Sequence, residues 1–111
     1  MSESGARVYI IEDNQDSGVI LRSLLECWGH HVVGEAYWVA TALNSIGSYR
    51  ELGVQIVTLD RDLYGGDVVD SGYLKFMARE FPEIPILDWQ GYQYQEYHMT
   101  WESRISVNWM Q

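Results

Sequence analysis

Acidic residues form two short groups that are well placed for chemistry. Glu12 and Asp13 directly follow one apolar run, and Asp60 and Asp62 directly follow another. Carboxylates about 4 Å apart repel each other by about 4 kcal/mol per pair at an effective dielectric near 20, so a fold that gathers them needs a cation or shared protons. Oxygen ligands on an open rim suit Mg²⁺. Such a site could orient a phosphoryl group, and one carboxylate could itself attack phosphorus.

A single acid at the end of a strand has a simpler explanation. Such acids often cap the next helix and interact with the positive end of its dipole. An acidic pair after one strand, combined with an acid after a second strand, is harder to explain in this way. We therefore favour a shared site for Glu12, Asp13 and Asp60, while helix capping stays open for each acid taken alone.

The acids can meet only if the runs before them are neighbouring strands of one sheet. The predicted strands are 8–11, 32–33, 56–59, 84–89 and 105–107, and the predicted helices are 16–28, 39–46 and 73–81. Alternating strands and helices of this size predict a parallel sheet with helices on both faces, joined by right-handed crossovers. Ligands of such sheets bind outside the carboxyl ends of the strands, which is where the acids would lie.

The first helix has the strongest pattern. Its apolar residues are Ile20, Leu21, Leu24, Leu25 and Trp28, and three of them recur at every fourth position. This spacing predicts an amphipathic helix. Asn14 or Asp16 is the expected N-cap, and Gly29 is expected to end the helix.

Length, charge and composition exclude several classes of protein. The chain has 111 residues, which predicts one domain. Sixteen acidic against seven basic side chains give a net charge of −9, so we expect no direct nucleic-acid binding. No stretch approaches the roughly 20 apolar residues of a membrane helix. Cys27 is the only cysteine, and the N-terminus lacks the apolar core of a signal peptide; the cytoplasm is therefore the expected location.

Three segments resemble the receiver domain of bacterial two-component response regulators. The run 8–14 resembles the opening strand of that family, the run 56–63 resembles the strand that carries its phosphoacceptor, and 84–87 resembles its fourth strand. The similarity covers 7–91 well and 92–111 poorly.

The resemblance implies one receiver-like domain over residues 1–111. It implies a flavodoxin-like α/β fold, with a five-stranded parallel sheet in the order 2-1-3-4-5 and helices on both faces. Only three residues follow Asn108 in the sequence, so we expect the last helix of the family to be missing.

The resemblance also implies roles for individual residues. Glu12, Asp13 and Asp60 would hold Mg²⁺ with the backbone carbonyl of Asp62, and Asp60 would accept a phosphoryl group. The donor would be a histidine kinase or a phosphotransfer protein. The implied function is that of a stand-alone receiver in phosphorelay signal transduction, which signals by protein–protein contact and is not an enzyme.

Several positions depart from the family pattern, and two of them, Gln90 and Asn108, fall on residues of the family's site. Gln90 stands where the family has Thr or Ser, and its amide can donate a hydrogen bond but is longer than a hydroxyl. Asn108 stands where the family has Lys, so it lacks the charge that would pair with carboxylate and phosphoryl oxygens. These departures leave a second function open, that of a docking module which does not depend on phosphorylation.

The C-terminal segment is rich in aromatic residues. Tyr94, Tyr97 and Trp101 have helical spacing, and Trp109 follows them. They are a candidate contact surface for a protein partner or a homodimer. Alternatively, the same side chains fold over the sheet as part of the core.

The pair Asp60 and Asp62 also resembles the nucleophile motif of haloacid-dehalogenase-type phosphohydrolases. In those enzymes the first Asp attacks phosphorus and the second acts as acid and base. Here the pair follows the third predicted strand rather than the first, and 111 residues leave little room for the other motifs. We therefore regard a phosphohydrolase as the weaker alternative.

Overall fold

A parallel four-stranded sheet forms the centre of the molecule. The computed structural model describes residues 5–60, 62–63, 65–67 and 71–87. The strands are β1 (Arg7–Ile11), β2 (His31–Ala36), β3 (Ile56–Leu59) and β6 (Ile86–Leu87). Their order is β2-β1-β3-β6, which confirms the expected order for the first four strands. The predicted strand at 105–107 and the place of a last helix lie outside the described residues.

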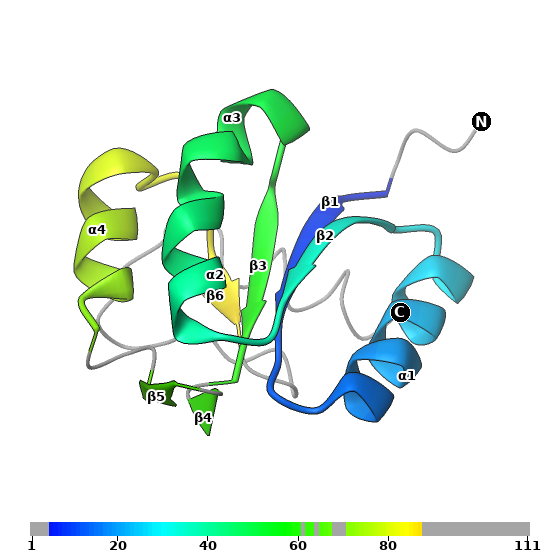
Figure 1. Ribbon diagram of the computed structural model, residues 1–111. Helices are drawn as coiled ribbons and strands as arrows, with labels where there is room; N and C mark the ends of the chain where they lie inside the picture. Colours follow the sequence, from blue (N-terminus) through cyan, green and yellow to red (C-terminus); the bar gives the residue numbers. More distant parts are fainter. Residues whose placement is uncertain (1–4, 61, 64, 68–70, 88–111) are drawn as a thin grey trace.

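Helices cover both faces of the sheet, as predicted. They are α1 (Gln15–Cys27), α2 (Val39–Ser45), the 3₁₀ turn η1 (Ile46–Ser48), α3 (Tyr49–Leu52) and α4 (Tyr73–Glu80). Figure 1 shows α1 on one side of the sheet and α2, α3 and α4 on the other. The weak helical pattern around 39–46 becomes three short pieces, because serine and glycine in this stretch are poor helix formers.

A small antiparallel ribbon follows β3. It pairs β4 (Asp62–Leu63) with β5 (Gly66–Asp67). Gly65 and Gly66 have φ values of 97° and 130°, which side chains other than glycine rarely adopt. The sequence predicts a tight turn at these glycines but not the two short strands beside it. The ribbon extends the chain beyond the carboxyl end of β3 (Figure 1).

Helix α1 begins and ends close to the predicted residues. The side chain of Asn14 accepts a hydrogen bond from the backbone N–H of Ser17 at 3.1 Å, which confirms Asn14 as the N-cap. Leu21 and Leu25 are buried. The residues that recur at every fourth position remain accessible: the exposed fractions of Ile20, Leu24 and Trp28 are 55%, 39% and 38%. The side of α1 that packs on the sheet is therefore the one with Leu21 and Leu25.

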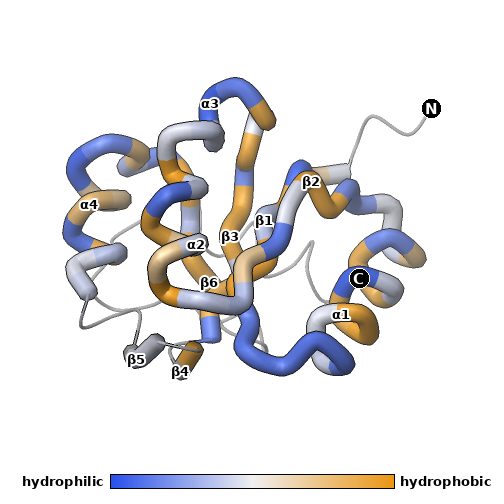
Figure 2. The backbone as a smooth tube through the Cα atoms, viewed as in Figure 1, coloured by the Kyte–Doolittle hydropathy of each residue, from blue (hydrophilic) through white to orange (hydrophobic). Residues whose placement is uncertain are grey.

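The core beneath α2, α3 and α4 is rich in aromatic rings. The ring centroid of Tyr49 lies 5.0 Å from that of Tyr9 and 6.0 Å from that of Phe81. The hydroxyls of Tyr49 and Tyr73 are hydrogen-bonded at 2.6 Å. A Cβ atom at Gly34 would lie 2.4 Å from the Tyr9 ring, so glycine is needed for this ring to pack against β2. Figure 2 shows the apolar residues that recur along β1 and β3.

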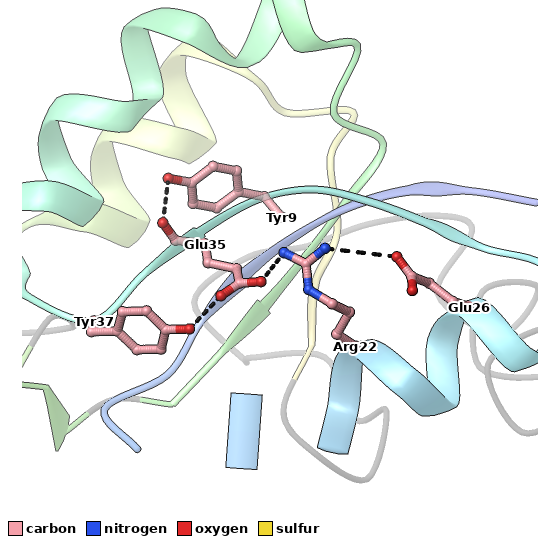
Figure 3. A network of polar contacts seen from close by, with 5 residues as sticks. All are labelled: Tyr9, Arg22, Glu26, Glu35 and Tyr37. Atoms are coloured by element: carbon pink, nitrogen blue, oxygen red, sulfur yellow. Dashed lines mark hydrogen bonds and ion pairs between the residues drawn. The ribbon is translucent and has the colours of Figure 1, made fainter. Parts of the chain in front are cut away.

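The opposite core lies beneath α1. Its buried residues are Val8, Ile10, Leu21, Leu25, Ile56 and Leu87. A polar network holds α1 against β2 (Figure 3). In this network the Arg22 guanidinium pairs with the carboxylates of Glu35 and Glu26, and the Tyr37 hydroxyl donates to Glu35. The network fixes α1 over the edge of the sheet that β2 forms.

Candidate functional site at the carboxyl edge of the sheet

Backbone hydrogen bonds place the acidic residues side by side. Ile11 and Leu59 are the last paired residues of β1 and β3. Beyond them, the N–H of Asp60 donates to the carbonyl of Ile11 at 2.9 Å, and the N–H of Glu12 donates to the carbonyl of Ala36 at 3.0 Å. The sheet ladder thus continues for one residue past the strands. It delivers the side chains that follow β1 and β3 to one edge of the sheet.

Three carboxylates gather at this edge. One oxygen atom each of Glu12, Asp13 and Asp60 lies within 4.8 Å of the other two. The exposed fraction of Glu12 is 4%, while Asp13 and Asp60 are half-buried. Asp13 directly precedes Asn14, the N-cap of α1, so the positive end of that helix dipole lies beside the cluster. One acid is therefore shielded from water, while the other two keep an opening to solvent.

The donor set fits a hard divalent cation. Carboxylate oxygens are the ligands that Mg²⁺ prefers, and Mg²⁺ keeps several waters, which needs an open side. The half-buried Asp13 and Asp60 provide such a side. Three negative charges this close together also repel one another, and a cation would offset that repulsion. Geometry, burial and ligand chemistry thus agree with a magnesium site formed by Glu12, Asp13 and Asp60.

Of the remaining predicted site residues, the structure describes only Asp62. The backbone of Asp62 lies on β4, two residues after Asp60, and the role of its carbonyl stays a prediction. Gln90 and Asn108 lie outside the described residues. So does the candidate contact surface, which consists of Tyr94, Tyr97, Trp101 and Trp109.

The same edge carries two aromatic residues that the sequence did not point to. Tyr37 and Trp38 directly follow β2, and Trp38 is exposed. The predicted second strand, 32–33, was too short. The strand continues to Ala36, but Gly34 and Glu35 are residue types that are uncommon in strands. A longer strand would have placed both aromatics at the carboxyl edge beside the acids. In the part of the chain that is described, no helix is long and apolar enough to cross a membrane.

Comparisons with known proteins rest on structure. No protein-family model matches the sequence, and no curated protein matches it either. Solved receiver domains do match the fold. The response regulator PhyR from Brucella abortus has a TM-score of 0.63 and 26% identity over 76% of this chain and 32% of its own. The receiver domain of PhyR from Erythrobacter litoralis has a TM-score of 0.64 and 21% identity, over 79% of this chain and 64% of its own.

A third similar structure belongs to a different regulator. The isolated receiver domain of RcsB from Salmonella enterica serovar Typhimurium, in the presence of the phosphomimetic BeF₃⁻, has a TM-score of 0.63 and 24% identity. The match covers 77% of this chain and 61% of that one. This chain therefore has the fold of a response-regulator receiver domain. It spans about a third of PhyR from Brucella abortus and under two thirds of the other two chains.

Proposed function

We propose that this chain is a phosphoryl-accepting receiver in a phosphorelay, with Asp60 as the acceptor. The observation that carries the proposal is the cluster of Glu12, Asp13 and Asp60 within 4.8 Å at the carboxyl edge of a receiver fold. A fold gains nothing in stability from three adjacent carboxylates, so a functional requirement is the simplest reason for their placement.

The chemistry needs one nucleophile and a way to offset charge. A carboxylate oxygen of Asp60 attacks the phosphorus of a phosphohistidine, the P–N bond breaks, and the imidazole leaves with the electron pair. The product is an acyl phosphate on Asp60. Glu12, Asp13 and the Asp62 carbonyl would hold Mg²⁺ beside it. When bound, the ion supplies positive charge that offsets the charges of the carboxylates and the phosphoryl oxygens.

The proposed partners follow from this chemistry. The donor is a histidine kinase or a phosphotransfer protein, and the phosphorylated chain signals through protein contacts. The chain modifies its own side chain once rather than turning over a substrate, so we do not assign it an enzymatic activity. With its single cysteine, Cys27, we place the proposed activity in the cytoplasm.

Phosphorylation by a small donor tests the proposal. The wild-type chain, incubated with acetyl phosphate and Mg²⁺, is expected to gain the mass of one phosphoryl group in intact-mass analysis. Asp60→Asn is expected to gain none, and removal of Mg²⁺ with a chelator should abolish the gain. Asp16→Asn removes an exposed carboxylate in the first turn of α1 and should be phosphorylated like the wild type.

Two results would contradict the proposal. One is a wild-type chain that stays unmodified under conditions that modify an ordinary receiver. That result would favour the docking module. The departures from the family pattern at Gln90 and Asn108 support that alternative. The other is an equal gain of mass in Asp60→Asn, which would place the phosphoryl group elsewhere.

A further inference from the structure

The loop between β1 and α1 carries two of the three clustered acids. Glu12 and Asp13 lie between Ile11, the last residue of β1, and Asn14, the N-cap of α1. The N–H of Glu12 donates to the carbonyl of Ala36 at 3.0 Å, which fixes the first half of the loop to β2. Asp13 is the next residue, beyond this bond. Its position therefore depends on how the first turns of α1 are held beside β2.

Tyr37 connects the end of β2 with the first turns of α1. It directly follows Ala36 and is half-buried. A Cβ atom at Gly18 would lie 3.4 Å from both the Cε1 atom and the hydroxyl oxygen of Tyr37, so the ring lies against the backbone of α1 at this glycine. The N–H of Gly18 donates to the carbonyl of Asn14 at 2.9 Å. The ring thus packs on the helical turn that directly follows Asp13.

The hydroxyl of Tyr37 fixes the ring in this place. It donates to one carboxylate oxygen of Glu35, and the other oxygen pairs with the guanidinium of Arg22 (Figure 3). Arg22 lies one turn after Gly18 on the same side of α1. The ring therefore contacts α1 directly at Gly18 and is connected to it a second time through Glu35 and Arg22.

The contact with Tyr37 also accounts for the glycine inside α1. Glycine is the least favourable residue in a helix after proline, because its backbone loses the most freedom on folding. Gly18 is buried although it has no side chain. A side chain larger than that of alanine would compete with the Tyr37 ring for the same space, since a Cβ atom already reaches contact distance. The close approach of Tyr37 therefore requires a residue that the helix alone disfavours.

We propose that Tyr37 is a positioning residue of the acidic site. By holding the first turn of α1 against β2, it keeps the Asp13 carboxylate near those of Glu12 and Asp60, so that the three can bind one divalent cation. Mg²⁺ tolerates little departure from octahedral geometry, which makes its affinity sensitive to a displaced ligand. The inference rests on the proposed Mg²⁺ site, and in it Tyr37 acts through α1 and not on the ion itself.

Tyrosine variants at two positions provide a matched comparison. The hydroxyls of Tyr37 and Tyr9 both bond to Glu35, the first at its carboxylate and the second at its backbone carbonyl. Tyr37→Phe is expected to raise the dissociation constant for Mg²⁺ about threefold, and Tyr37→Ala about tenfold, as for other residues that orient a metal ligand. Tyr9→Phe should change it by less than about twofold, because the Tyr9 ring packs in the core on the opposite face of the sheet.

Calorimetric titration separates the positioning role from the site itself. The dissociation constants are measured with MgCl₂ at a temperature at which circular dichroism shows every variant to be folded. Binding that is as tight in Tyr37→Phe and Tyr37→Ala as in Tyr9→Phe would overturn the positioning role and leave the proposed site intact. A wild-type chain that binds no Mg²⁺ would overturn both.

Hydrogen exchange tests the same contact without any metal. In the metal-free chain, Tyr37→Ala is expected to speed exchange of the Gly18 amide about tenfold relative to that of Leu25, which lies further along α1. Taking this ratio removes the effect of global stability. Tyr37→Phe keeps the ring, so it should show a smaller increase, and it carries the test if Tyr37→Ala does not fold. A ratio that stays at the value of Tyr9→Phe would show that Tyr37 does not hold this turn and would overturn the proposal.

Discussion

Polar groups are treated differently in two regions of the molecule, the core beneath α2, α3 and α4 and the acidic carboxyl edge of the sheet. In the core, polar atoms are paired: the Tyr49 hydroxyl is hydrogen-bonded to Tyr73 and to Ser45, and burial raises the pKa of Tyr49, which keeps the phenol neutral. At the edge, three carboxylates lie within 4.8 Å of one another, and Glu12 is nearly inaccessible to water. The first arrangement stabilises the fold, whereas repulsion between adjacent carboxylates is expected to oppose folding.

The two regions are one residue apart along each strand. Ile11 and Leu59 belong to the core, while Glu12 and Asp60 follow them directly and belong to the edge. The strands that carry the core therefore also fix the positions of the acids. Stability and the proposed chemistry are supplied by different residues of the same two strands, so substitutions should affect them separately.

The largest expected effect comes from the core. Met77 is fully buried, and Met77→Ala should lower the free energy of unfolding by about 2–5 kcal/mol, because it leaves a cavity. The neighbouring Phe76 is partly exposed and contacts Arg79 through a cation–π interaction, so Phe76→Ala should cost about 1 kcal/mol. Urea unfolding followed by circular dichroism measures both. Equal losses of unfolding free energy in the two variants would mean that the packing of Met77 on α4 does not contribute specially to this core.

The edge should show a smaller effect of opposite sign. Asp13→Asn removes one of three clustered charges and should raise the free energy of unfolding by about 1–3 kcal/mol without Mg²⁺. We expect less than the roughly 4 kcal/mol per pair at an effective dielectric near 20, because Asp13 is half-buried and water screens its charge. Asp16→Asn makes the same charge change outside the cluster. It should lower stability by about 0.3–1 kcal/mol, because Asp16 interacts favourably with the α1 dipole.

Mg²⁺ sharpens the difference between the two variants. The ion should stabilise the wild type and Asp16→Asn, by about 1.4 kcal/mol at ten times the dissociation constant. Asp13→Asn should gain less, since it has lost a ligand. A loss of stability in Asp13→Asn without Mg²⁺, equal to that of Asp16→Asn, would show that the cluster carries no strain.

Local sequence patterns predicted the elements that are strongly apolar or strongly periodic. The strands 8–11 and 56–59 and the helices at 16–28 and 73–81 correspond closely to β1, β3, α1 and α4. Strand β2 was predicted too short, because Gly34 is required by the Tyr9 ring, a tertiary contact that no local pattern shows. The ribbon of β4 and β5 was also missed.

The proximity of the acids followed from topology alone, since parallel neighbouring strands share a carboxyl edge. The orientation of α1 did not follow from its sequence. Two adjacent apolar stripes, one with Leu21 and Leu25 and one with Leu24 and Trp28, could each have faced the sheet. In the structure Leu21 and Leu25 face the sheet, and Arg22 on the neighbouring flank of α1 pairs with Glu35 on β2. Periodicity within one helix cannot contain that information.

Titration of the side-chain carboxyl carbons with Mg²⁺, followed by carbon-13 NMR, tests the central claim most directly. If Glu12, Asp13 and Asp60 form one site, their three carboxyl resonances will shift together along a single binding curve, while the resonance of Asp16 stays in place. Three independent curves, or shifts no larger than that of Asp16, would contradict the claim that these acids act as a unit.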